Sequence, residues 1–197
     1  MAVYAQTFTG LLFLTLFNVG GIARPFGAPC EALVSMAPAA AAHGDANKFA
    51  PPYVVEFLNP GSETEPECYR ANRNYLVRIR STDGKGFSGF ILQCRDINDN
   101  RFGTFLQGSG NADQWQYQCH KPDSITHIRA NRKNFVNVMW RPNGFAGEFA
   151  CKATVLQSLF VWWSKIPSRT LRPCPAEEGN NVPFTDFQQR RFRHHRP

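Results

Sequence analysis

The sequence predicts an all-β fold, a sandwich of two antiparallel sheets. Between residues 53 and 163, short apolar alternations are separated by turn-forming residues, with no amphipathic helix long enough to connect parallel strands. Glycine (15 residues), proline (14) and phenylalanine (17) are frequent and methionine (3) is scarce, a composition typical of strands joined by turns. With 197 residues, the chain is long enough for one domain with appendages and short for two.

Nine short antiparallel strands are expected in this region. Alternating apolar residues mark each strand, and pairs such as Asp83-Gly84 and Asn143-Gly144 mark turns between them. Residues 30–52 contain an alanine run with proline and glycine and are predicted to be mostly loop. The expected strands span residues 53–58, 75–80, 88–96, 103–106, 114–119, 124–128, 134–140, 147–155 and 159–163.

The first 23 residues have the pattern of a signal peptide. Residues 11–19 are almost wholly apolar, and this run is too short to cross a bilayer of about 30 Å as a helix. The small residues Gly20, Gly21 and Ala23 follow it, so cleavage is expected after Ala23. A buried N-terminal strand or helix is the alternative. The pattern favours a secreted, extracellular protein.

Six cysteines in a secreted chain predict three disulfides. None of them forms a C-x-x-C pair, and their spacing matches neither a zinc site nor a redox motif. Strand alternation places Cys94 and Cys151 on inward faces, which favours a Cys94–Cys151 bridge. A second bridge, Cys68–Cys174, would tether the C-terminal segment.

The chain is basic, with 22 Lys and Arg against 15 Asp and Glu, and a net charge of +7. Such a balance favours an anionic partner, and on charge alone nucleic acid, acidic glycan and bacterial envelope remain open. Residues 164–197 carry seven basic and three acidic residues together with five prolines. We therefore expect a globular domain at residues 24–163, followed by a flexible basic tail at residues 164–197.

Several basic residues are candidates for binding an anionic ligand. Alternation in the stretch LVRIR places Arg78 and Arg80 on one exposed sheet face, a second group forms a basic turn near residue 130, and a third lies in the C-terminal run RRFRHHRP. Such charges are also common on solvated surfaces without a ligand. The candidates are Arg78, Arg80, Arg129, Arg132, Lys133, Arg190, Arg191 and Arg193.

No catalytic residue, metal ligand or cofactor is predicted. His127 has no Ser, Asp or Cys partner at an interpretable spacing, and a structural role is favoured. The adjacent His194 and His195 would form only a weak metal site. Trp115 and Tyr117 share a strand face and could stack on a carbohydrate or fill a core equally well. The tryptophans 140, 162 and 163 are interpreted as core or sheet-face residues.

Several segments in order resemble the reeler domain, also called the reelin domain, of secreted arthropod defence proteins. They include GAPCEALVSMAPAAAAHG near the start, FSGFILQCRD at residues 87–96, GTF at residues 103–105, SITH at residues 124–127 and FACKATVLQSLFVWW at residues 149–163. The resemblance covers residues 27–163. It implies an immunoglobulin-like β-sandwich of about eight or nine antiparallel strands, stabilised by disulfides that include Cys30–Cys119.

The resemblance implies a secreted innate-immune protein that binds microbial surfaces such as lipopolysaccharide, lipoteichoic acid or glucan. An extracellular matrix or adhesion module that binds acidic glycans is the alternative, because reeler domains also occur in large matrix glycoproteins. An oxidoreductase would need haem-bearing membrane segments, as in ferric reductases that contain this domain. The expectation is therefore a binding protein without enzymatic activity, membrane span or nucleic-acid partner.

Overall fold

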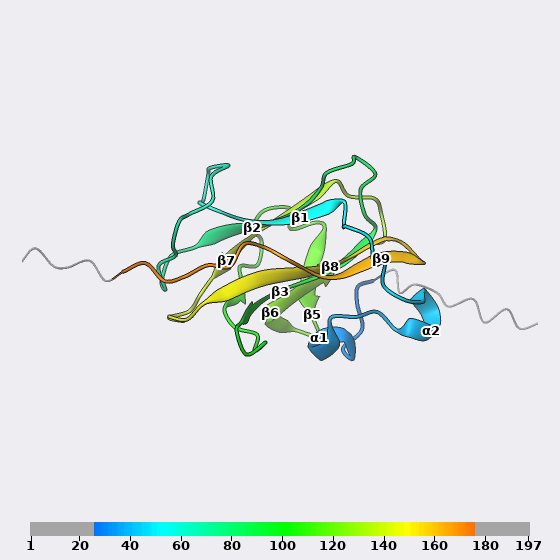
Figure 1. The fold of residues 1–197 in the computed structure, drawn as a ribbon, viewed down its shortest axis with the longest axis horizontal. Coiled ribbons are helices and arrows are strands. Elements are labelled where there is room, and N and C mark those ends of the chain that lie inside the picture. Colours follow the sequence, from blue (N-terminus) through cyan, green and yellow to red (C-terminus); the bar gives the residue numbers. More distant parts are fainter. Residues whose placement is uncertain (1–25, 176–197) are drawn as a thin grey trace, which may run out of the picture.

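Two antiparallel sheets pack face to face in the computed structural model, which describes residues 26–175 (Figure 1). The first sheet has the strand order β1-β2-β7-β4, and the second has the order β5-β6-β3-β8-β9. All nine expected strands are present, so the all-β prediction is confirmed. The strands are β1 (Tyr53–Leu58), β2 (Tyr75–Ser81), β3 (Gly89–Asp96), β4 (Thr104–Phe105), β5 (Trp115–Gln118), β6 (Lys121–His127), β7 (Phe135–Arg141), β8 (Phe149–Ser158) and β9 (Val161–Pro167).

Aromatic side chains from both sheets meet in the core between them. The ring of Phe149 on β8 lies 5.4 Å from that of Phe57 on β1 and 5.1 Å from that of Trp140 on β7. Trp140 is fully buried, in agreement with a core role. Gly103, at φ +76°, lies so close to the Trp140 ring that an added Cβ would come within 2.3 Å of it, so this position requires glycine.

The structure contains three disulfides, and their pairs are those expected. Cys94 and Cys151 face each other on the neighbouring strands β3 and β8, with a Cα–Cα distance of 3.8 Å. This bridge therefore joins two strands of one sheet, and both cysteines are fully buried. Cys30–Cys119 links the N-terminal segment to the β5–β6 turn, and Cys68–Cys174 links the β1–β2 connection to the C-terminal segment.

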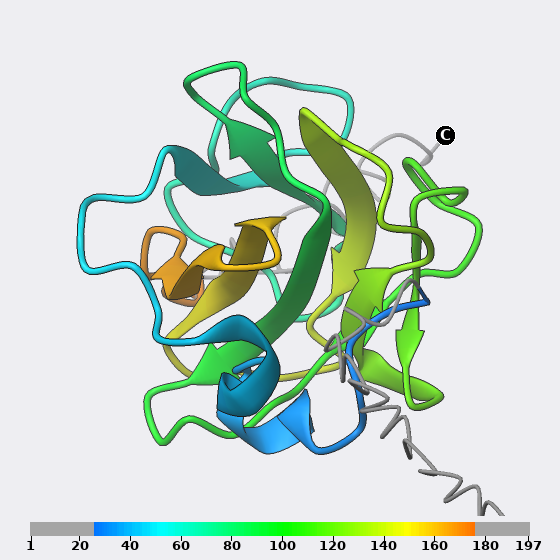
Figure 2. The same ribbon diagram turned by 90° about the vertical axis from the view of Figure 1, so that its right-hand side faces the viewer.

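Two short helices lie in the segment expected to be loop. They are α1 (Ala32–Ser35) and α2 (Ala40–His43), each one turn long. Figure 2 shows them next to each other, in blue, beside the strands. Met36, fully buried, packs with Ala32 against Ile91 of β3, so this segment covers part of the outer face of the second sheet.

The folded domain extends beyond the expected boundary at residue 163. Strand β9 runs to Pro167, and the buried Leu171 forms a backbone bridge with Phe149. The prolines and charges of this stretch predict a flexible tail, but Ile166 and Leu171 are buried, and backbone pairing with β8 holds residues up to Pro167. The C-terminal strand therefore belongs to the core. The expected signal peptide and residues 176–197 lie outside the described residues.

Candidate ligand-binding surface

Arg78 and Arg80 are paired with acids on the face of the first sheet. Arg78 donates from Nη1 and Nη2 to the two carboxylate oxygens of Glu63, at 2.5 and 2.8 Å, and Arg80 Nη2 lies 2.6 Å from Glu56 Oε1. The hydrogen bond from Arg78 lowers the pKa of the Glu63 carboxyl. Register explains only the contacts of Glu56, which stands directly opposite Arg78, with 3.6 Å between Arg78 Nη1 and Glu56 Oε2, and diagonally to Arg80. Glu63 belongs to the connection between β1 and β2. These two arginines are balanced within the sheet, and we place the candidate surface elsewhere.

Lys133 is buried rather than exposed on the basic turn. Its Nζ donates to the carbonyl oxygens of Arg129 and Asn131, both at 2.7 Å, and to that of Ser88 at 3.3 Å. Burial lowers the pKa of this lysine to about 8. The backbone of Lys133 also exchanges two hydrogen bonds of 2.8 Å with Phe87. Lys133 therefore ties the turn to itself and to the start of β3.

The turn held by Lys133, residues 129–133, is called the basic loop below. Arg129 and Arg132 are exposed on it, and neither forms an ion pair with another residue in the range 26–175. Two free guanidinium groups are thus carried by a loop whose backbone is fixed from inside. Of the other candidates, Arg190, Arg191 and Arg193 lie outside the described residues.

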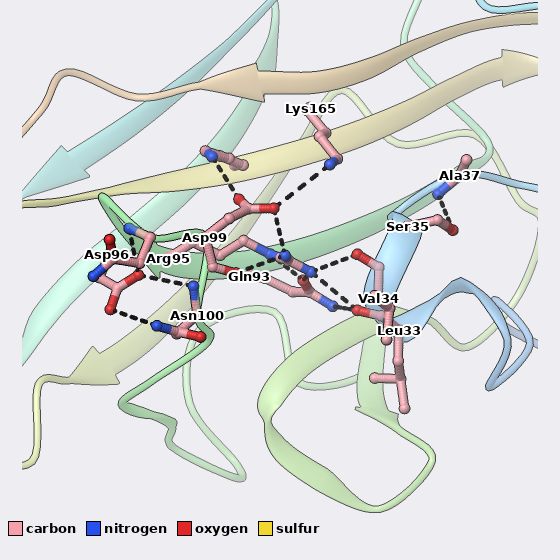
Figure 3. Close-up of polar contacts among 12 residues, drawn as sticks. Leu33, Val34, Ser35, Ala37, Gln93, Arg95, Asp96, Asp99, Asn100 and Lys165 are labelled. Carbon is pink, nitrogen blue, oxygen red and sulfur yellow. Dashed lines mark hydrogen bonds and ion pairs between the residues drawn. The ribbon is translucent and has the colours of Figure 1, made fainter.

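A second basic cluster, not predicted from the sequence, lies on the outer face of the second sheet (Figure 3). The Asp99 carboxylate lies 2.9 Å from Arg95 Nη1, 2.8 Å from Lys152 Nζ and 3.7 Å from Lys165 Nζ. The hydrogen bond from Lys152 and the nearby cations lower the pKa of Asp99. The carboxylate of Asp99 thus faces three cations. Gln93 and Arg95 alternate with the inward-facing Cys94 along β3, and this alternation is the sequence signal that could have predicted polar residues on the outer face.

An apolar cavity of about 150 Å³ opens on the same outer face, between α2 and the strands β3, β6 and β8. Two histidines border it. His43 Nδ1 lies 2.8 Å from the carbonyl oxygen of Leu159, and His127 Nδ1 accepts a hydrogen bond from the backbone N–H of Phe90 at 3.3 Å. This agrees with a structural role for His127. Apolar lining residues include Pro38, Ala42, Ile91, Ala130, Leu156 and Leu159.

Trp115 and Tyr117 both make contacts inside the fold. Trp115 is buried and donates from Nε1 to the carbonyl oxygen of Ser109 at 3.2 Å, and the Tyr117 hydroxyl donates to that of Phe105 at 2.8 Å. The two rings also border a hollow of about 350 Å³ with Gly108 and Ala112. Their anchoring favours the core interpretation over a sugar platform.

Within residues 26–175, no group of three or more His, Cys, Asp or Glu side chains is arranged to hold a metal ion. Over the same range, no helix has the length and apolar character needed to cross a membrane.

A family model of the reeler domain matches residues 31–178. The chain belongs to the reeler-domain family. This agrees with the resemblance carried by its sequence segments, and the match reaches beyond residue 163 to include β9 and the bridge at Cys174.

Two relatives of the chain are insect proteins named as defense proteins. The Bombyx mori relative is 28% identical over 181 residues, which cover 87% of this chain and 98% of the relative. The "Defense protein l(2)34Fc" of Drosophila melanogaster is 29% identical over 108 residues, 53% of this chain and 66% of the relative.

Solved reeler structures share the fold. The Reelin-N domain of F-spondin gives a TM-score of 0.55 at 17% identity, covering 74% of this chain and 98% of that domain. A crystal structure of the human F-spondin reeler domain gives 0.54 at 18% identity, covering 67% and 95%. At this identity the likeness concerns the fold alone.

Proposed function

We propose that this reeler protein is a secreted defence protein that binds the anionic surfaces of microbes, such as lipopolysaccharide and lipoteichoic acid, without catalysing a reaction. One observation carries the proposal. Arg129 and Arg132 are exposed on the basic loop, and within residues 26–175 no acid pairs with them. Guanidinium groups bind phosphate in a bidentate, planar geometry, and phosphate is a main charge of both surfaces.

The fixed backbone of the basic loop favours binding. Lys133 holds two carbonyl oxygens of the loop at 2.7 Å, so little backbone ordering is required when a ligand arrives. The net charge of +7 attracts anionic surfaces over a longer range. Each arginine contact is weak, but a microbial surface repeats the same phosphate group and many weak contacts add through avidity.

Three further observations support secretion and defence. Three disulfides in one domain are typical of proteins that fold in an oxidising compartment. Two relatives carry defense-protein names. The predicted signal peptide of residues 1–23 adds a sequence-based argument for export.

The test compares two variants of equal charge. Arg129→Gln/Arg132→Gln removes both free guanidinium groups of the basic loop. Arg73→Gln/Lys121→Gln removes two exposed charges elsewhere that likewise form no ion pair within residues 26–175. Binding to immobilised lipopolysaccharide and lipoteichoic acid is measured at low and high ionic strength, with neutral glucan and heparin as further arms.

We expect the loop variant to lose binding to both bacterial polymers, most at low ionic strength, because salt screens exposed charges over about 10 Å at 0.1 M. The control variant should lose much less. Equal losses of binding in the two variants would mean that only the net charge matters, and would overturn the role of the basic loop. Preferential binding to heparin would instead favour the adhesion module that binds acidic glycans.

A further inference from the structure

The apolar cavity has the size and lining of a site for a hydrocarbon group. Its volume of about 150 Å³ is that of a cavity able to hold a molecule roughly as large as benzene. The floor is formed by β3 residues Gly89 and Ile91, and an added Cβ at Gly89 would come within 3.2 Å of the His127 ring. A side chain at this position would therefore require the His127 ring to shift by a few tenths of an ångström.

Two exposed aromatic residues directly neighbour lining residues of the cavity in the chain. Phe26 is 76% exposed and precedes the lining residue Gly27, and Phe160 is 70% exposed and follows the lining residue Leu159. Single exposed apolar residues are ordinary, but two on segments that border one apolar cavity indicate contact with an apolar partner.

The segments that form the cavity also carry a positive charge. The stretches 26–29, 38–48, 88–91, 127–133 and 156–160 contain four basic residues and one acidic residue, Asp45. Arg129 directly precedes the lining residue Ala130 in the chain, so the basic loop that borders the apolar space also carries an exposed arginine. An apolar floor with a basic border matches a molecule that has a hydrocarbon chain and an anionic head group. Of the four basic residues, Lys48, Arg129 and Arg132 are exposed, whereas the Lys133 ammonium is bound by carbonyl oxygens inside the loop.

We propose that this cavity binds the end of an acyl chain of an anionic lipid, with the phosphate of the head group at Arg129. The inference rests on the proposed function for the source of the lipid, the outer surface of a microbe, and it names the lipid part as the portion that the domain holds. Burial of each CH₂ group strengthens binding about fourfold, so a few carbons add materially to the phosphate contact.

Two neighbouring alanines on α2 give a matched test. Ala42 lines the cavity, whereas Ala41 is exposed and does not line it. Ala42→Trp should fill the space, and Ala41→Trp places the same side chain on the outside of the same helix. Full-length protein is titrated with dodecyl phosphate below its micelle concentration. Binding is followed by calorimetry and by the NMR signals of the His43 and His127 rings.

For the unsubstituted protein and for Ala41→Trp, we expect saturable binding with shifts of both histidine signals. Ala42→Trp should bind at least about tenfold more weakly. Dodecyl maltoside, with the same chain and a neutral head group, should bind more weakly than dodecyl phosphate to the unsubstituted protein. The histidine shifts require no variant, so the proposal stays testable even if Ala42→Trp fails to fold.

Histidine signals that stay unchanged during the titration would overturn the proposal, because they would mean that dodecyl phosphate does not enter the cavity. Equal binding by folded Ala42→Trp and Ala41→Trp would overturn it too. The experiments test the proposed function independently of the cavity assignment. If dodecyl phosphate does not bind but the Arg129 and Arg132 variant loses bacterial binding, only the cavity assignment falls. If dodecyl phosphate binds and microbial polymers do not, the cavity assignment is supported and the microbial target falls.

Discussion

Arg95 on β3 donates a hydrogen bond of 2.9 Å from Nη2 to the carbonyl oxygen of Val34 in α1. The same nitrogen donates to the carbonyl oxygen of Leu33 at 3.1 Å, so one side chain of the sheet caps the end of a one-turn helix. Such a short helix is not stable alone and depends on contacts of this kind. Arg95 is 4% exposed, which makes it a buried anchor between the second sheet and the segment that leads to α2 and the cavity.

Substitution Arg95→Met should therefore destabilise the fold and release α1. Gln93 Oε1 and Asp99 would both lose a buried charged donor, and removal of one partner from such a group costs about 3 kcal/mol. Urea unfolding measures the loss, and hydrogen exchange should report faster exchange of amides in residues 32–36. Lys152→Met is the control, because Lys152 contacts the same carboxylate from a more exposed position and should cost at most about 1 kcal/mol. Equal costs would contradict the anchoring role.

The strands could be predicted from sequence because their alternation reports which face is buried. The same alternation pointed Cys94 and Cys151 inward, and they pair across β3 and β8. Helices α1 and α2 could not be predicted this way, since four residues carry too little periodicity and contacts far along the chain hold them. The folded part of the C-terminal segment could not be predicted, because prolines and arginines are typical of a flexible tail and only two apolar residues, Ile166 and Leu171, indicate burial.

The candidate site was less predictable than the fold. The sequence places Arg78 and Arg80 on an exposed sheet face, but their pairing with Glu56 of β1 and Glu63 of the following connection depends on strand register and on the path of that connection. Lys133 looked like its neighbour Arg132 in sequence, yet the loop path turns it inward. The cavity is lined by five separate stretches of chain, so no local sequence pattern predicts it.

The Cys94–Cys151 bridge should stabilise the domain without shaping it. Its cysteines already face each other in a paired ladder, so Cys94→Ala/Cys151→Ala should keep the native sheet. The bridge closes 57 residues, which in the chain-entropy model is worth about 4 kcal/mol through the unfolded state. Urea unfolding should show that loss, while amide exchange in the native state keeps the β3–β8 pattern. A rearranged β3–β8 pattern would mean that the bridge sets the register.

Residues 164–175 should be required for folding. A chain that ends at Trp163 loses the buried Ile166 and Leu171 and the partner of Cys68. Burial of two such aliphatic side chains contributes roughly 3 to 6 kcal/mol, before the loss of the disulfide. A chain that ends at Pro175 keeps all these contacts. Thermal unfolding should therefore show a large loss for the first truncation relative to the second, and similar midpoints would contradict the extended domain boundary.

The buried Lys133 should make stability rise with pH in the alkaline range. Burial lowers its pKa from 10.5 to about 8 in the folded protein, so between these values the unfolded chain binds more protons than the native one. The free energy of unfolding then increases with pH. Relative to Lys133→Met, which does not titrate, the native protein should gain roughly 1 to 2 kcal/mol between about pH 7.5 and pH 9.5.

Urea unfolding of both proteins across that range measures the Lys133 effect, and the window ends below the pKa of about 12 to which burial raises Tyr53 and Tyr69. Between about pH 6 and pH 7 the lysine is protonated in both states, so the difference between the two proteins should stay constant there. A difference that stays flat or falls from pH 7.5 to pH 9.5 would mean that the oxygens around Nζ compensate the charge fully. In that case Lys133 would stay protonated and keep its hydrogen bonds to the basic loop from pH 7.5 to pH 9.5.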